Sequence, residues 1–227
     1  MRLSVIVPVW NEESTLPALL GELRKQCDGV DCELVFVDGG STDGTEQLLR
    51  DSGATWVVSD RGRGVQMNAG AAATGAEVLL FLHADTRLPP GWKLVVAEAI
   101  AGGHIGGFFR VRLDSPRLIL RVVGHLITLR SRATGISTGD QGLFVTRQIF
   151  ESAGGYAHLP LFEDVELTRR LRRFGRLAAV DSTVVTSARR WDQLGPWRTI
   201  VRMWGLRALY ALGMRPERLA RYYEIAR

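Results

Sequence analysis

Short apolar runs alternate with amphipathic stretches over roughly the first hundred residues of the chain. The apolar runs have the length and the Val-, Ile- and Leu-rich composition of buried strands, and they lie at 3–9, 33–37, 54–58 and 79–82. Patterns of helical period separate them at 11–26, 45–51 and 65–74. Strands that alternate with helices in this way predict an α/β fold, with a mostly parallel central sheet flanked by helices.

The second half of the chain is less regular. Its apolar patterns predict strands at 106–113 and 141–146 and two short strands between 177 and 186. Predicted helices lie at 115–130 and 163–174, and a predicted Gly-, Ser- and Thr-rich loop lies at 132–140. An arginine-rich helical pattern follows from 196 onward. We therefore expect one domain over 1–195 and a basic helical extension over 196–227.

Composition adds only broad limits. The chain has 227 residues, of which 46% are hydrophobic and 23% charged, so it can form a substantial core. Its net charge of +5 is too small to choose among anionic ligands, nucleic acid and lipid. Aromatic and basic residues interleave only in the tail, so we expect no nucleic acid as a partner. No apolar run is long enough to cross a bilayer, and the first strand begins too early for a signal peptide.

Cys27 and Cys32 are too few to form a disulfide framework. We interpret them as small apolar side chains at a junction between a helix and a strand. Together with the absence of a signal peptide, this interpretation predicts a reducing, cytoplasmic compartment.

The most informative stretch is 79–86, an apolar strand that ends at His83 and Asp85. Ligands bind at the carboxyl ends of strands in open α/β sheets. Asp85 offers a hard oxygen ligand for Mg²⁺ or Mn²⁺, which need few other protein ligands when substrate phosphates are present. The alternative for Asp85 is a cap on the helix after Pro90. His83 is either a nitrogen ligand or a hydrogen-bond partner of a neighbouring loop.

A second carboxylate, Asp38, ends the strand that precedes Gly39 and Gly40. Such an aspartate can accept hydrogen bonds from a base or a ribose, and the glycines allow a ligand to approach the backbone. The alternative is an aspartate that caps its own turn, a role that Asp43 fits better.

Arg61 and Arg63 lie on a glycine-containing turn before a helix N-terminus, where phosphate oxygens are favoured. Exposed Arg-Gly turns are common, so this signal is weak by itself. The turn is not a dinucleotide-binding fingerprint, because Met67 stands where the third glycine would be.

Two adjacent acids, Glu163 and Asp164, follow an aromatic residue before a helical pattern. Acids are favoured in the first turn of a helix by its dipole, and they also suit a general base. Farther along, Arg190 and Trp191 could neutralise a pyrophosphate or stack on a ring. The alternative for this pair is a solvated basic surface.

Taken together, these stretches resemble the family 2 glycosyltransferases, nucleotide-sugar-dependent enzymes of GT-A fold. The similarity involves 5–12, 37–45, 61–70, 82–85, 138–142, 163–164 and 190–191. The chain departs from the family's Asp-x-Asp motif, because His83 replaces the first Asp. It also has Ser187 in place of the Gln of the Gln-x-x-Arg-Trp motif, so we do not infer a processive polymerase. The combination is similar to a small bacterial subgroup labelled as associated with arsenosugar biosynthesis, a label that says little about substrate.

The resemblance implies a nucleotide-binding half over about 1–90 and an acceptor-side half over about 91–195. It implies nucleotide contacts at Pro8, Val9, Asn11, Glu12, Asp38, Gly40, Arg61, Arg63, Asn68, Ala84 and Asp85. It implies sugar or acceptor contacts at His83, Gly139, Asp140, Gln141, Glu163, Arg190 and Trp191. It further implies that Asp164 is the catalytic base and that Asp85 binds Mn²⁺ or Mg²⁺. The acids at 38, 85 and 164 should then meet at one cleft.

The implied reaction is inverting transfer of a sugar from a nucleotide-sugar donor, most simply a UDP-sugar, to a hydroxyl of a small-molecule or lipid-linked acceptor. The alternatives are a nucleotidyltransferase, which shares the metal carboxylate and the nucleotide pocket, and a non-catalytic sugar-nucleotide-binding protein. The pair Glu163–Asp164 argues against a protein without a base.

The segment 196–213 interleaves apolar residues with arginines. It is typical of a basic amphipathic helix on an anionic membrane, near a lipid-linked acceptor. The alternative is a helix that packs on the domain or on a second subunit, which would make a homodimer. Membrane contact would place the protein on the inner face of the cell membrane.

Overall fold

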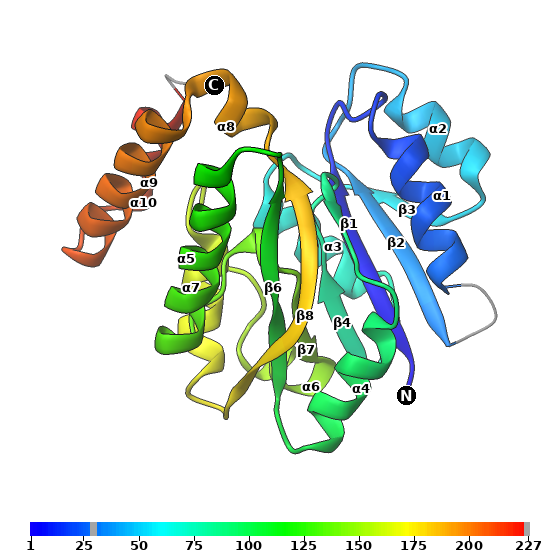
Figure 1. Ribbon diagram of the computed structural model, residues 1–227. Helices are drawn as coiled ribbons and strands as arrows, with labels where there is room; N and C mark the ends of the chain where they lie inside the picture. Colours follow the sequence, from blue (N-terminus) through cyan, green and yellow to red (C-terminus); the bar gives the residue numbers. More distant parts are fainter. Residues whose placement is uncertain (28–30, 225–227) are drawn as a thin grey trace.

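In a computed structural model that describes residues 1–27 and 31–224, eight strands form one sheet in the order β3-β2-β1-β4-β7-β6-β8-β5 (Figure 1). The strands are β1 (Leu3–Val9), β2 (Cys32–Asp38), β3 (Thr55–Val58), β4 (Val78–Phe81), β5 (Thr86–Arg87), β6 (Gly106–Asp114), β7 (Leu143–Thr146) and β8 (Leu177–Ser187). The predicted α/β fold with a mostly parallel sheet is confirmed.

Helices cover both faces of this sheet. They are α1 (Leu16–Cys27), α2 (Thr45–Ser52), α3 (Arg63–Ala72), α4 (Trp92–Ala101), α5 (Leu118–Thr134), α6 (Arg147–Ser152), α7 (Glu163–Leu171), α8 (Arg189–Leu194), α9 (Pro196–Ala211) and α10 (Pro216–Glu224). Buried residues of α1, α2 and α4 pack on one face, and those of α3, α6 and α7 pack on the other. The central strands are buried on both faces: in β4, Leu80 belongs to the first layer and Leu79 to the second.

Strand direction explains how the two halves of the chain meet. β1 pairs in parallel with β2 and β4, whereas β7 pairs antiparallel with β4 and with β6. Because β7 is reversed, it begins at the edge where β1, β2 and β4 end. β8 runs parallel to β6 and ends at that same edge. The turn before β7 and the segment after β8 therefore lie beside the residues that follow β4.

The C-terminal helices pack on the domain. Leu206 of α9 and Leu219 of α10 are buried in a cluster with Leu161, Phe162 and Val165, next to the start of α7. The Phe162 and Tyr210 rings stack with their centroids 4.8 Å apart. The segment 196–224 therefore contacts the part of the chain that carries Glu163 and Asp164. Packing of this segment on the domain, which the sequence left open as an alternative to membrane contact, is therefore observed.

Several predicted boundaries were wrong. α1 begins at Leu16 and not at residue 11, because Asn11 adopts a left-handed φ of 53° and its Oδ1 accepts the Thr42 N–H. β8 is one continuous strand in place of two short ones. α5 extends to Thr134 into the predicted loop, and Gly139–Gln141 is a 3₁₀ turn that precedes β7. The short elements β5 and α6 were not predicted.

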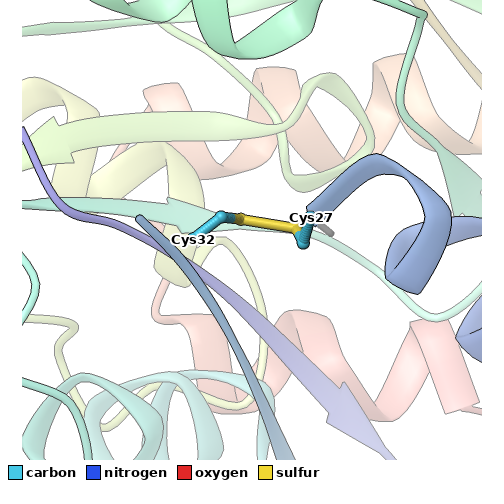
Figure 2. The surroundings of a disulfide bond; sticks show 2 residues. All are labelled: Cys27 and Cys32. Carbon is cyan, nitrogen blue, oxygen red and sulfur yellow. A yellow bond between two sulfur atoms is a disulfide. The ribbon is translucent and has the colours of Figure 1, made fainter. Parts of the chain in front are cut away.

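The interpretation of the cysteines as unpaired side chains was also wrong. Figure 2 shows a disulfide that joins Cys27, at the end of α1, to Cys32, at the start of β2. Their Cα atoms lie 5.3 Å apart, within the range that a disulfide spans. This is the sheet edge opposite the one where β1 and β4 end. The predicted reducing compartment loses the support of unpaired cysteines, and cytoplasmic location stays a prediction.

Within residues 1–27 and 31–224, the structure contains no helix with the length and apolar character needed to span a membrane.

Candidate active site

A cavity of about 870 Å³ lies at the sheet edge where β4 and β8 end. Predicted site residues that line it are Asn11, Glu12, Arg63, His83, Asp85, Gly139, Asp140, Glu163, Asp164 and Trp191. Predicted residues that are not among its lining are Pro8, Val9, Asp38, Gly40, Arg61, Asn68, Ala84 and Gln141. The side chain of Arg190 lies outside the described residues. The cavity thus combines side chains from both halves of the chain.

Asp164 lies in the first turn of α7, not in a loop before it. Its Oδ2 accepts the Gly139 N–H at 2.6 Å, and its Oδ1 accepts the Val165 N–H at 2.6 Å. Burial raises the pKa of Asp164 and the Asp140 charge adds to this, while the two N–H groups and His83 oppose it. A carboxyl group with a raised pKa, facing a cavity, suits proton transfer.

Glu163 precedes it and is buried. Burial is the main cause that raises the pKa of Glu163, the Asp164 charge adds to it, and the Arg63 charge opposes it. The cavity thus contains two adjacent acids whose pKa values are both raised. The residue before them, Phe162, has a left-handed φ of 65°, which is costly for a side chain of this size.

His83 packs against the turn before β7. Its Nδ1 lies 3.3 Å from Asp140 Oδ1, and a Cβ at Gly139 would come within 2.3 Å of its Nε2. Position 139 therefore excludes any larger residue while His83 stays in place. Of the two interpretations of His83, contact with a neighbouring loop is the one the geometry favours.

Asp85 is exposed and faces the cavity. Its backbone oxygen accepts the Ser187 N–H, which ties the end of β4 to the end of β8. Across 1–27 and 31–224, no three His, Cys, Asp or Glu side chains gather closely enough to hold a metal ion alone. A single carboxylate fits Mg²⁺ or Mn²⁺ when substrate phosphates complete the coordination, and the hard oxygen of Asp85 suits both ions.

The carboxylate of Asp38 is directed into its own turn. It accepts hydrogen bonds from the Ser41 N–H and from Ser41 Oγ. Asp85 and Asp164 share the cavity, whereas Asp38 ends β2, which β1 separates from β4, and its oxygens are engaged by Ser41. This is the turn-capping alternative that the sequence left open.

The side-chain amides of Asn68 and Gln141, both predicted to contact ligands, form hydrogen bonds within the protein. Asn68 Nδ2 donates to the Tyr156 carbonyl, and Asn68 Oδ1 accepts the Tyr156 N–H, both at 2.9 Å. Gln141 is fully buried, donates to the Phe109 carbonyl and accepts from Ser131 Oγ. Neither side chain lines the cavity.

Sequence reasoning missed Trp10, Gln66 and Arg130. Trp10 lines the cavity, and the Arg61 guanidinium lies 3.5 Å from its ring centroid. Gln66 is buried and donates to the carbonyls of Val9 and Val37, which links the ends of β1 and β2. An aromatic residue directly after a buried strand was the available signal for Trp10.

Arg130 projects from α5 into the cavity and is half-buried. Burial lowers the pKa of Arg130, and the charges of Asp164 and Asp140 oppose that shift. The arginine therefore supplies positive charge close to the two aspartates. Little in the sequence singled it out, because Arg121 and Arg132 lie on the same helix.

Solved structures support the fold. The mannosyltransferase PcManGT from Pyrobaculum calidifontis, in complex with GDP-Man and Mn²⁺, aligns with a TM-score of 0.64 and 22% identity over 81% of this chain and 56% of that one. TarS 1–349 from S. aureus, in complex with UDP, aligns with a TM-score of 0.62 and 23% identity over 82% of this chain and 60% of that one. The predicted GT-A fold is confirmed by these similarities.

A curated relative extends the comparison to sequence. The undecaprenyl-phosphate 4-deoxy-4-formamido-L-arabinose transferase of Aeromonas hydrophila is 32% identical over 152 residues, which is 61% of this chain and 46% of the relative. The chain thus spans about half the length of this relative. Residues 4–150, more than half of the chain, match the family model described as glycosyl transferase family 2. Because this match covers more than half of the chain, including Asp38 and Asp85, the chain belongs to glycosyl transferase family 2.

Proposed function

We propose that the protein is an inverting glycosyltransferase that moves a sugar from a nucleotide-sugar to an acceptor hydroxyl. The observation that carries the proposal is the carboxyl group of Asp164, with its raised pKa, in the same cavity as Asp85. A UDP-sugar is the proposed donor. The complex of TarS with UDP supports this choice. The mannosyltransferase complex with GDP-Man makes a GDP-sugar the alternative donor.

In the proposed reaction, Asp164 takes the proton of the acceptor hydroxyl while the hydroxyl oxygen attacks the anomeric carbon. The bond from that carbon to the nucleoside diphosphate breaks, and the diphosphate leaves with the bonding electrons. One base and one displacement invert the anomeric centre. A positioned general base contributes about 10²–10⁴-fold to such a step.

The leaving diphosphate needs charge neutralisation. We propose that Asp85 holds Mn²⁺ or Mg²⁺, in line with the Mn²⁺ of the mannosyltransferase complex. When bound, the ion would stabilise negative charge on the diphosphate oxygens. Arg63 and Arg130 line the same cavity and would add fixed positive charge.

For the acceptor we propose a lipid-linked molecule. Its reacting group is a hydroxyl, because Asp164 is proposed to take a hydroxyl proton. The name of the curated relative includes undecaprenyl phosphate, whose reacting group would be a phosphate oxygen, so the relative supports a lipid carrier and not the hydroxyl. Part of the cavity wall here is apolar, with Leu126, Ile127 and Met203 among its residues. Peripheral contact of 196–213 with the inner face of the cell membrane is proposed with it, and homodimer formation stays a prediction.

The test of the base is Asp164→Asn, which keeps the size of the side chain and removes its basicity. Turnover should fall by about 10²–10⁴-fold, because no carboxylate remains to take the proton of the acceptor hydroxyl. Binding of UDP, followed by calorimetry, should stay close to wild type. The control is Asp51→Asn, an exposed aspartate on α2 that bonds only to Gln47 among the hydrogen bonds described. Wild-type turnover in Asp164→Asn would contradict the assignment, and release of pyrophosphate in place of UDP would indicate a nucleotidyltransferase.

The test of the metal site is Asp85→Ala. UDP binding should weaken in the variant when Mn²⁺ is present, and the difference from wild type should vanish when a chelator removes the ion. The measurement is calorimetric titration of UDP with and without Mn²⁺. An equal loss of affinity in chelator would show that Asp85 acts without a metal.

A further inference from the structure

One side of the cavity is apolar, and a polar nucleotide-sugar donor does not account for it. α5 and α9 form this side, with Leu126 and Leu129 on one helix and Trp204 on the other. These three residues line the cavity and are also exposed to solvent. They therefore mark its mouth. Both helices lie on the same side of the sheet (Figure 1).

Exposed apolar residues continue from this mouth along both helices. On α5 they recur with helical spacing, as do those on α9, so each helix carries one apolar stripe. The exposed stripes comprise Leu118, Val122, Leu126 and Leu129 on α5, and Trp197, Val201 and Trp204 on α9. Their exposed fractions lie between 45% and 71%. Apolar side chains gathered in this way mark a surface for a partner.

The charge of the two helices indicates the kind of partner. α5 and α9 together contain no Asp or Glu, and they contain Arg121, Arg130, Arg132, Arg198, Arg202 and Arg207. Arginines beside apolar and Trp side chains are typical of helices that lie in the interface of an anionic bilayer. A second copy bound through the same surface would bring like charges together, which argues against a symmetric dimer here.

We propose that α5 and α9 together form a docking surface for an anionic lipid bilayer, so that the cavity opens at the membrane. This surface includes α5, which lies outside the tail segment considered above. Its purpose rests on the proposed function, because a lipid-linked acceptor could then reach Asp164 without leaving the bilayer. The apolar stripes would enter the interface, and Arg121 and Arg198 would contact lipid phosphates. Arg130 and Arg207 line the cavity, Arg132 pairs with Asp181, and Arg202 donates to carbonyls of α10.

The experiment is flotation of the full chain with vesicles of phosphatidylcholine, with and without phosphatidylglycerol. The wild-type protein should float with the anionic vesicles and less with the neutral ones. Two double variants lie on the stripes and away from the cavity lining: Leu118→Gln with Val122→Gln, and Trp197→Gln with Val201→Gln. Each should lower the partition constant by about tenfold or more, a change of about 1.4 kcal/mol, because two apolar side chains no longer enter the interface.

The matched control is Leu94→Gln, which changes a leucine of α4 that is 64% exposed. It should float like wild type. Wild-type flotation of the α5 variant would overturn the two-helix surface, and so would a wild-type dimer in sedimentation that the same variant separates. UDP binding by wild type is measured in parallel: binding without flotation defeats this proposal alone, and flotation without binding defeats the proposed function alone.

Discussion

Glu163 and Asp164 are held where ionisation is disfavoured. Burial raises the pKa of both carboxyl groups, and the Asp164 charge raises that of Glu163 further. An acid with a raised pKa in the folded state binds protons that the unfolded chain has already released. Folding is therefore weakened as pH rises from the ordinary carboxyl range through the raised pKa values. The site is less stable in its ionised, active form than a neutral one would be.

This predicts an effect of Glu163→Gln on stability. The variant should unfold at a higher temperature than wild type at about pH 8, because one of two adjacent buried charges is gone. The difference should shrink as pH falls through the raised pKa of Glu163, because the wild-type carboxyl group then becomes neutral like the amide. Thermal unfolding across that pH range measures it. An equal difference at every pH would assign the change to packing.

At the residue scale, motif spacing predicted which types of side chain would meet. His83, Asp85, Glu163 and Asp164 all line the cavity, whereas Asp38, which was expected to share it, does not. Spacing could not show which predicted polar groups are already engaged. The partner of Asn68 lies 88 residues away in the sequence, and a partner so distant is invisible until the chain is folded.

At the scale of elements, α3 lies unusually close to the sheet. A Cβ at Gly70 would come within 2.4 Å of Ile6 Cγ2 and 2.9 Å of Val37 Cγ2. The glycine therefore lets the helix lie directly on β1 and β2. This close approach also positions Gln66 to bond both strand ends.

Gly70→Ala should destabilise the protein by about 1–3 kcal/mol, because the methyl group overpacks a filled core. Gly21→Ala is the matched control on α1, where a Cβ would meet nothing within 4 Å. That change should stabilise by about 0.5–1 kcal/mol, the usual gain for alanine inside a helix. Urea unfolding of both variants measures the difference. A neutral Gly70→Ala would mean that α3 can shift outward.

Elements with strong periodicity were predicted well, and those defined by pairing were not. The predicted strands at 3–9 and 79–82 agree with β1 and β4 to within one residue at each boundary. β8 was divided in two because Asp181 interrupts its apolar pattern, yet Asp181 is exposed and bonds to Arg110 and Arg132. β5 has two residues and exists through pairing with β8. No local pattern can predict so short a strand.

At the scale of the whole molecule, the C-terminal helices share a core with the start of α7. The sequence predicted a separate extension because its arginines and tryptophans gave no sign of which face was buried. Leu219 is fully buried in that shared cluster, whereas Leu212, on the same tail, is 84% exposed. The two leucines offer a direct comparison.

Leu219→Ala should cost about 2–5 kcal/mol, since it leaves a cavity in a packed cluster. Leu212→Ala should change stability by less than about 0.5 kcal/mol, because its side chain is in water. Unfolding in urea, followed by fluorescence and circular dichroism together, measures both. A separate early transition in Leu219→Ala would show that the tail unfolds independently.

The pairing of β4 with β7 has a consequence for how substrates enter. The ladder from Val78 to Phe81 joins the two halves by backbone hydrogen bonds, with Thr146 to Leu143 opposite. The two halves cannot separate by a hinge motion without breaking these hydrogen bonds, so we expect them to move as one body in the part of the chain that the structure describes. Admission and release must instead depend on the rim, where the turn before β7 and helices α8 and α9 surround the opening.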